Sequence, residues 1–244
     1  MTENTEETKS KEVVSWEDQM AMDAKAMRER ERPALAFMSL KSGIMAIGGE
    51  PVEDNFLDCV IIAVVNEMVH YKEKWQEGVI SRPDCYASGE MRTEQLAPHK
   101  KVEKPYSETC KECPYFVWGS DLQGGKGREC KERRKMALLP SDGSAEMCIL
   151  SIPGTSIKGW SNYVRTIVAT TGMSPAGVIT RIKVKPHLKN QFEVTFTQEG
   201  NVPEELRGAV MSKRNDALEV LTAPYPDLDE EEESKPKPKS KRKY

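Results

Sequence analysis

Residues 177–200 read GVITRIKVKPHLKNQFEVTFTQEG, and this stretch indicates a fold built mainly of strands. In its first half, one set of side chains occupies every second position: Val178, Thr180, Ile182 and Val184. In its second half, apolar side chains again alternate with polar ones: Phe192, Val194 and Phe196. Alternation with a period of two is typical of strands that have one buried face. The stretch therefore predicts a β-hairpin with one apolar face.

The segments around this hairpin predict further strands and two helices. Strand-like apolar runs occur at 35–56, 57–75, 135–140 and 146–153. Apolar side chains recur at helical spacing between Thr155 and Gly172, and Trp160 belongs to that face, so we expect a helix there with Trp160 in the core. A second, short helix is expected from about Pro203 to Leu221.

This order of elements predicts a mainly β fold with added helices (α+β). An OB-like Greek-key barrel fits the order, because the strand pairings are mostly local in sequence and a helix is inserted between strands. We expect this core at 33–222, with a loop insert at about 82–135. A polar N-terminal arm or helix is expected at 1–32, and a disordered tail at 223–244.

Four of the six cysteines lie in polar, turn-rich sequence and predict a metal site. They are Cys85, Cys110, Cys113 and Cys130. Cys110 and Cys113 form a C-x2-C pair before a proline, with 24 residues separating Cys85 from the pair and 16 separating the pair from Cys130. Four thiolates suit a closed tetrahedral Zn²⁺ site, which can order a segment that has little apolar core. The expected insert is therefore zinc-stabilised.

Alternatives to this zinc site stay open. His99 could replace one cysteine, an iron–sulfur cluster is a second option, and redox chemistry at the C-x2-C pair is a third. The two remaining cysteines, Cys59 and Cys148, lie inside apolar runs and are expected to be buried as small hydrophobic side chains.

Basic residues are segregated along the chain, although its formal net charge is −3. Residues 156–190 contain six Lys or Arg and no Asp or Glu, and residues 126–135 contain six basic and two acidic residues. Arg181, Lys183 and Lys185 alternate on the predicted hairpin, so they would form a row spaced about 6.5–7 Å apart. Such a row suits a phosphate backbone and reads no sequence.

Aromatic residues lie close to the basic, cysteine-rich segment, as they do in proteins that stack nucleic-acid bases. The predicted nucleic-acid contacts are Tyr106, Tyr115, Phe116, Trp118, Lys126, Arg128, Lys158, Arg181, Lys183 and Lys185. Two alternatives remain: the basic row could be a solvated outer face, and the aromatics could be packing anchors over the metal.

The end of the chain is acidic and then basic. Residues 227–233 (DLDEEEE) contain six acidic residues in seven, and residues 234–244 (SKPKPKSKRKY) follow. An acidic block can compete with phosphate for a basic groove or contact replication and recombination proteins. The basic end leaves this competition open, because it could be a second nucleic-acid contact or only a solubilising tail.

No stretch resembles a signal peptide or reaches the length of about 18 apolar residues that a membrane helix requires. We therefore expect a cytoplasmic protein without a membrane partner. Its oligomeric state stays open, with a homo-oligomer as one possibility.

Four segments and their setting resemble a known family. They are SRPDCYASG, CKECPYFVWGS, GGKGREC and SIPGTSIKGW, in a strand-led core with a charged tail. This combination resembles the single-stranded DNA-binding replication proteins of bacteriophages, some of which carry zinc in an OB-fold core. The resemblance spans roughly 57–197. It implies sequence-independent binding of single-stranded DNA in replication, recombination or repair within the host cytoplasm, with the four cysteines named above as zinc ligands.

Motifs for catalysis are missing from the sequence. No P-loop, H-E-x-x-H or G-x-S-x-G motif occurs, and none of the three histidines is paired with an evident nucleophile. We therefore expect a binding protein and no catalytic residues. The competing hypothesis is a zinc-ribbon adaptor that binds host polymerase or replication machinery.

Overall fold

The computed structural model describes residues 15, 16, 19, 20, 22, 36–73, 81–122, 124–142 and 147–225. The chain divides into two units, Met1–Ala34 and Leu35–Tyr244. In the first unit, four of the five described residues are helical. Most of the predicted N-terminal arm and residues 226–244 of the predicted tail lie outside the described residues.

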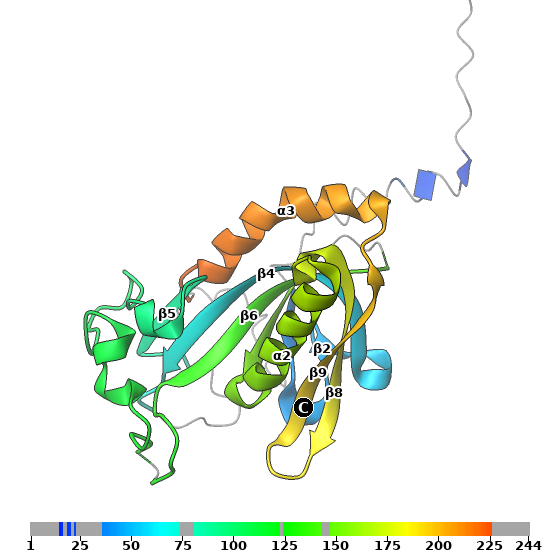
Figure 1. The fold of residues 1–244 in the computed structure, drawn as a ribbon. Helices are drawn as coiled ribbons and strands as arrows, with labels where there is room; N and C mark the ends of the chain where they lie inside the picture. The colour runs from blue at the N-terminus through cyan, green and yellow to red at the C-terminus, as the bar shows by residue number, and fades with distance from the viewer. Residues whose placement is uncertain are drawn as a thin grey trace, which may run out of the picture. The chain divides into compact units, whose positions relative to one another are not determined.

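In its described residues, the second unit is a mixed sheet with two α-helices (Figure 1). Its strands are β1 (Ala36–Ser39), β2 (Ala46–Ile47), β3 (Glu50–Pro51), β4 (Phe56–His70), β5 (Cys85–Gly89), β6 (Lys131–Pro140), β7 (Cys148–Pro153), β8 (Val178–His187) and β9 (Gln191–Asn201). The helices are α2 (Gly154–Thr171) and α3 (Glu204–Thr222). No helix in the described ranges is both long and apolar enough to cross a membrane.

The strand order is β3-β2-β1-β7-β6-β4-β8-β9, and β5 pairs with the far end of β4. All described pairings are antiparallel except that of β1 with β7. The predicted mainly β, α+β class is confirmed. The strand path between β3 and β9 stays open among the described residues, so the described sheet is a curled, open half-barrel.

Asn55 fixes part of this curl, because its side chain links the turn after β1 to β8. Its Nδ2 donates to the carbonyls of Gly43 and Val184, at 2.8 and 3.2 Å. Its Oδ1 accepts a hydrogen bond from the backbone N–H of Met45 at 2.6 Å. Asn55 thereby holds the turn after β1 against β8.

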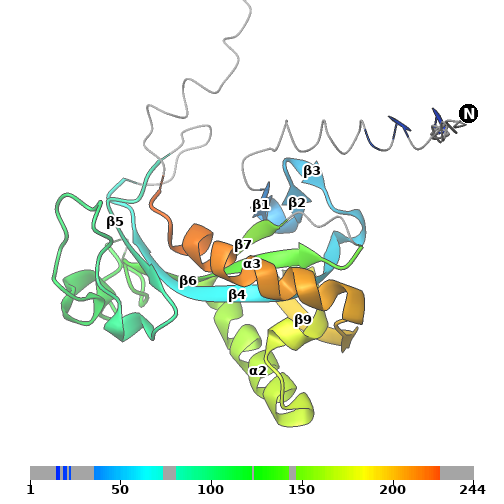
Figure 2. The ribbon, with the colours of Figure 1, turned by 90° about the horizontal axis from the view of Figure 1, so that it is seen from above.

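Strand β4 is the centre of the sheet and is apolar on both faces. Cys59 and Ile61 belong to the core cluster under α2, whereas Val60 and Ile62 belong to the cluster under α3. A bulge between Ile61 and Ala63 shifts the register against β6. Figure 2 shows α3 lying across β4, and α2 lies on the other face of the sheet. A strand covered on both faces needs no polar alternation, which is why this apolar run can form one continuous strand of 15 residues.

The predicted hairpin and the helix before it are confirmed. Strands β8 and β9 pair over their whole lengths, and the side chains of Thr180, Ile182 and Val184 are buried. Trp160 in α2 is buried as expected. The helix ends at Gly172, whose φ of 68° is the left-handed conformation that glycine adopts without a steric penalty.

Helix α3 is also confirmed, and its apolar side packs on the sheet face opposite α2. Val210, Ala217 and Leu221 are buried there. Arg214 donates from Nη1 to the carbonyl of Ile62, at the β4 bulge, with a distance of 3.2 Å. The packed chain continues past the predicted tail boundary, because the hydroxyl of Tyr225 donates to Glu67 at 3.0 Å.

The predicted insert at 82–135 is shorter in the structure. Cys85–Gly89 is strand β5 and Lys131–Pro140 is strand β6, so the basic residues from Lys131 onward belong to the sheet. In the described part of the segment between these strands, the regular elements are short 3-10 helices, at Thr93–Gln95, Cys110–Glu112 and Pro114–Phe116. It lies at the β5 end of β4, away from β8 and β9 in both ribbon views.

Candidate nucleic-acid interface and cysteine pocket

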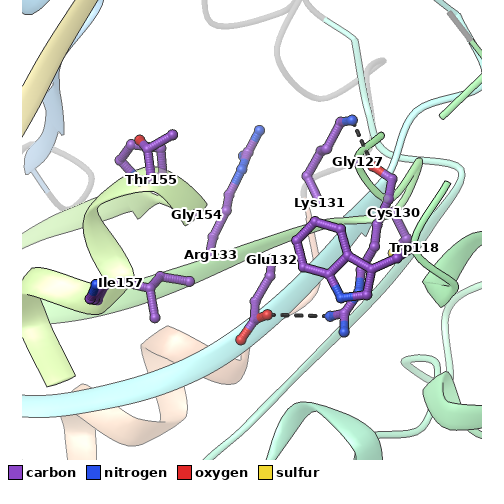
Figure 3. Close-up of a pocket in the computed structure, with 12 residues that line it drawn as sticks. Trp118, Gly127, Cys130, Lys131, Glu132, Arg133, Gly154, Thr155 and Ile157 are labelled. Atoms are coloured by element: carbon purple, nitrogen blue, oxygen red, sulfur yellow. Dashed lines mark hydrogen bonds and ion pairs between the residues drawn. The ribbon is translucent and has the colours of Figure 1, made fainter. Parts of the chain in front are cut away.

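A cavity of about 590 Å³ lies beside β6, where β7 ends and α2 begins. We call it the basic cavity. Among the side chains that line it, four are basic and one is acidic: Arg128, Lys131, Arg133, Lys158 and Glu132. Trp118 lines the cavity together with Gly154, Thr155 and Ile157 of the first turn of α2. Figure 3 shows Trp118 and Lys131 on the side of the cavity opposite Thr155 and Ile157, with Arg133 between them.

The start of α2 is positioned by a close approach of its first residue to β6. A Cβ atom on Gly154 would lie 3.2 Å from the carbonyl oxygen of Glu132, so a larger residue would push the helix away. Pro153 precedes the helix, no side chain caps its first turn, and that turn holds no acidic residue. The positive end of the helix dipole therefore adds to the charge of the basic cavity.

Trp118 is presented by a loop that folds back on itself. The backbone N–H groups of Gly119 and Asp121 both donate to the carbonyl of Gly127, at 2.9 and 3.3 Å. The indole is 71% exposed. The guanidinium of Arg128 lies over the rings of Phe116 and Trp118, 4.1 and 4.9 Å from their centroids. This arrangement fixes a cation beside an exposed aromatic face, which is the pairing that single-strand binding uses.

Internal partners neutralise only part of the positive charge. Nη1 of Arg128 lies 3.5 Å from Glu132, and Nζ of Lys131 lies 3.5 Å from Asp121. Nζ of Lys131 also donates to the carbonyl of Arg128 at 2.7 Å (Figure 3). Lys158 is exposed on α2. The basic cavity therefore keeps an excess of positive charge that faces solvent.

The predicted row on β8 is present, but its first member is already paired. Arg181, Lys183 and Lys185 share the face of the sheet opposite α2, as the alternation predicted. Arg181 forms a two-point hydrogen bond with Asp58 and lies 3.7 Å from Glu199. Its guanidinium also covers Phe56, with 4.3 Å to the ring centroid.

The two lysines of this row also have neighbours on the adjacent strands, one of them acidic. Lys185 stands opposite Glu193 of β9 in the strand register, and Lys183 lies 5.7 Å from the ring centroid of Phe56. The interpretation of the three residues as one free phosphate-binding row therefore needs correction for Arg181. The row lies at the Phe56 end of β4, whereas β6 places the basic cavity near the His70 end.

Three of the predicted aromatics are used for packing near the cysteines. Tyr115 stacks on His70 with 4.4 Å between ring centroids, and Tyr106 meets Tyr115 edge-on at 4.8 Å. Phe116 packs against the cluster that contains Cys110 and Cys130. Lys126 is exposed in the glycine loop and is not among the residues that line the basic cavity. Of the predicted contacts, the cavity unites Trp118, Arg128 and Lys158.

The four predicted metal ligands line one small cavity of about 10 Å³, which we call the cysteine pocket. Cys85 begins β5, Cys110 begins a 3-10 helix, and Cys113 follows the end of that helix. Cys130 precedes β6, and its N–H donates to the carbonyl of Tyr115 at 3.0 Å. A volume of this size holds about one water-sized atom, so it suits a single ion. None of the six cysteines forms a disulfide.

The thiols of the cysteine pocket influence one another. Burial, with the adjacent thiols of Cys85 and Cys113, raises the pKa of Cys110 to about 12. Burial also raises the pKa of Cys130, and its three neighbouring thiols add to the effect. A bound cation would reverse this preference, because it stabilises thiolates and releases their protons.

Within the described ranges, no three His, Cys, Asp or Glu side chains are grouped in the way expected of a formed metal site. The four cysteines nevertheless line the same small cavity. Binding of zinc therefore requires these side chains to turn toward one centre.

The sequence reasoning overlooked His70, which also lines the cysteine pocket. His70 is 3% exposed, and neither of its ring nitrogens has a hydrogen-bond partner. Its place at the end of β4, opposite Cys85 in the register, was not visible without the strand pairing. His99, by contrast, stacks on Tyr86 and accepts the N–H of Lys101 at 3.1 Å, and it does not line the pocket.

Comparisons of the chain with protein-family models, with curated proteins and with solved structures found no match.

Proposed function

We propose that this chain is a sequence-independent single-stranded DNA-binding protein that acts in DNA replication, recombination or repair, of the zinc-containing, OB-like type encoded by bacteriophages. The observation that carries the proposal is the basic cavity. It combines four cations, the uncapped start of α2 and an exposed indole in one place.

The chemistry of the basic cavity suits a single strand in two ways. Lysine and arginine side chains neutralise phosphates and release counterions, which gives affinity without base preference. Trp118 offers a flat ring on which a base can stack, and every base has a face that can do so. A duplex would leave Trp118 without a base to stack on, because its bases are stacked on one another.

Zinc has a structural role in this proposal. Cys113 and Cys130 lie on either side of the loop that carries Trp118 and Arg128. A Zn²⁺ ion held by these two cysteines with Cys85 and Cys110 would fix both ends of that loop. The metal would supply folding energy and no catalysis. The acidic block at 227–233, outside the described residues, is proposed to contact replication or recombination proteins.

One observation favours the adaptor hypothesis instead. Val117, Trp118 and Leu122 are 58, 71 and 70% exposed, so the same loop presents apolar side chains that a protein partner could cover. Such a contact would depend little on salt, whereas phosphate binding depends on it strongly.

The direct test is a fluorescence anisotropy titration of labelled dT15 with the full chain at several potassium chloride concentrations. Our proposal predicts that the logarithm of the binding constant falls linearly with the logarithm of the salt concentration. The adaptor hypothesis predicts no binding of dT15 at any of these concentrations.

A further inference from the structure

A second cavity, of about 300 Å³, lies between the sheet and the end of α3. We call it the Glu67 cavity. Strands β1, β4, β6 and β7 contribute Phe37, Glu67, Arg133 and Ser151 to its lining, and Val220 and Tyr225 close it from the side of α3. Its walls are mainly apolar, as is usual for sites that bind small planar ligands.

Glu67 is the unusual residue of this cavity, because it is a carboxylate with a side chain only 1% exposed. Its Oε1 accepts the hydroxyl of Tyr225 at 3.0 Å and lies 3.5 Å from Nζ of Lys135. Burial raises the pKa of Tyr225, so this hydroxyl stays protonated and remains a donor to Oε1. One oxygen of the carboxylate is therefore fully engaged.

The other oxygen of Glu67 has no partner. Oε2 of Glu67 and Oγ of Ser151 are both buried without a hydrogen bond, and both residues line the same cavity. An unpaired buried acceptor costs roughly 1–3 kcal/mol, and more when it is charged. Folded proteins retain such atoms where a ligand or water supplies the missing partner. A charged acceptor that lines a cavity together with an unpaired hydroxyl favours a ligand with an N–H group.

Arg133 connects this cavity to the basic cavity, because it lines both. A single DNA strand that places a phosphate near Arg133 can turn one of its bases into the Glu67 cavity. Phe37 is 63% exposed, and with Tyr225 it supplies aromatic surface for a flat ring.

We propose that the Glu67 cavity binds one nucleobase that carries an exocyclic amino group, with that group donating to Oε2 of Glu67. This inference rests on the proposed function for its source of bases, although a free nucleotide has the same chemistry. Cytosine, adenine and guanine each offer an amino donor. Thymine offers one ring N–H between two carbonyl oxygens, and these would face a carboxylate with like charge. The protein should therefore prefer cytosine over thymine, in addition to its general affinity for single strands.

Two titrations of the full chain test this proposal at pH 7.5. The first compares dC15 with dT15, and the second follows dCMP and dTMP by saturation-transfer NMR. We expect dC15 to bind about tenfold more tightly than dT15, which corresponds to one hydrogen bond to a charged group. Glu67→Gln should abolish this preference and leave the salt slope unchanged. Glu50→Gln, which alters an exposed carboxylate on β3, is the matched control and should keep the preference.

Because Glu67 also holds Tyr225 and Lys135, Glu67→Gln could destabilise the fold. Ser151→Ala is the second variant, since its hydroxyl has no partner to lose and the fold should be unaffected. It should reduce the dC15 preference severalfold with an unchanged melting temperature.

The outcomes separate this proposal from the proposed function. Equal affinity for dC15 and dT15, with no dCMP signal, would overturn the Glu67 cavity as a base site and leave single-strand binding standing. A Glu67-dependent dCMP signal without any oligonucleotide binding would support the cavity and refute the proposed function. Absence of all binding would overturn both.

Discussion

Arg181 of β8 donates from Nε and Nη2 to the two carboxylate oxygens of Asp58 in β4, each at 2.7 Å, although 123 positions separate the two residues. The pair joins neighbouring strands on the face of the sheet opposite α2. A guanidinium held in this way is not free to neutralise a phosphate. The pair therefore shifts the expected binding surface from β8 toward the basic cavity.

The first prediction concerns this pair. Arg181→Ala should change the logarithmic salt slope of dT15 binding by less than the roughly 0.7 units expected of one lost phosphate contact. It should also lower the melting temperature slightly, because Asp58 loses its partner. Asp58→Asn is the matched variant: if it frees Arg181, affinity for dT15 should rise. If Arg181→Ala flattens the salt slope by roughly 0.7 units or more, the original row hypothesis would be restored.

The second prediction concerns zinc. Protein purified without chelator should contain one Zn²⁺ per chain by elemental analysis, and removal of the metal should lower the melting temperature. Cys110→Ser should lose the metal. Cys59→Ser should keep it, because Cys59 is buried in the main core, where its thiol lies 3.7 Å from the carbonyl of Thr180. Zinc-free wild-type protein that melts at the same temperature would rule out this site.

The third prediction separates binding from packing among the aromatics. Trp118→Ala should weaken dT15 binding by roughly 1–3 kcal/mol at an unchanged salt slope, because stacking releases no counterion. Its melting temperature should stay the same, since the side chain is 71% exposed. Phe116→Ala should do the reverse and mainly lower stability, because Phe116 packs against Cys110 and Cys130. Equal effects of both variants on binding would argue against this division of roles.

The fourth prediction tests the core under α2 by pH. The hydroxyl of Tyr163 and Oγ1 of Thr180 lie 2.6 Å apart, and burial raises the pKa of Tyr163. In the unfolded chain this tyrosine ionises near its usual pKa of about 10. The stability that it contributes is therefore complete below that pH and is lost as the pH rises toward the folded pKa.

Urea unfolding at pH 7 and pH 11 measures this effect. Tyr163→Phe should cost roughly 1–3 kcal/mol at pH 7, because it leaves the buried hydroxyl of Thr180 unpaired. Between pH 7 and pH 11, this variant should lose less stability than the wild type does. The double variant Tyr163→Phe with Thr180→Val should recover part of the loss at pH 7. An identical alkaline loss in Tyr163→Phe and the wild type would disprove the assignment.

Local patterns were enough to predict much of the fold. The period-two alternation at 177–200 gave the β8–β9 hairpin, and the helical spacing before Gly172 gave α2 with Trp160 in the core. Four cysteines in turn-rich sequence were expected to converge, and they line one pocket. The hairpin and the helix depend on residues that are near one another in the sequence. The cysteine pocket was predictable because cysteine is uncommon in loops.

Features that depend on distant pairing could not be predicted in this way. Glu67 and Tyr225 are 158 positions apart, and neither stands out in sequence. The charge of Arg181 gave no hint of Asp58, because the order of β4 and β8 in the sheet was unknown. The basic run around Lys131 read as part of a loop, although β6 pairs it with the end of β4. Spacing alone does not reveal which strands become neighbours.

The central claim is that the basic cavity beside α2 binds the phosphates of a single strand. The most direct measurement is the salt slope of dT15 binding for Lys131→Ala with Lys158→Ala, beside a control that replaces Lys41 and Lys104, two exposed lysines outside the cavity. Our account predicts that the cavity variant flattens the slope by roughly 0.7–1.4 units and weakens all sequences alike, because Lys158 contributes about 0.7 per phosphate and Lys131, which lies 3.5 Å from Asp121, contributes less. It predicts a smaller change for the control. A folded cavity variant with the wild-type slope and affinity would contradict the account.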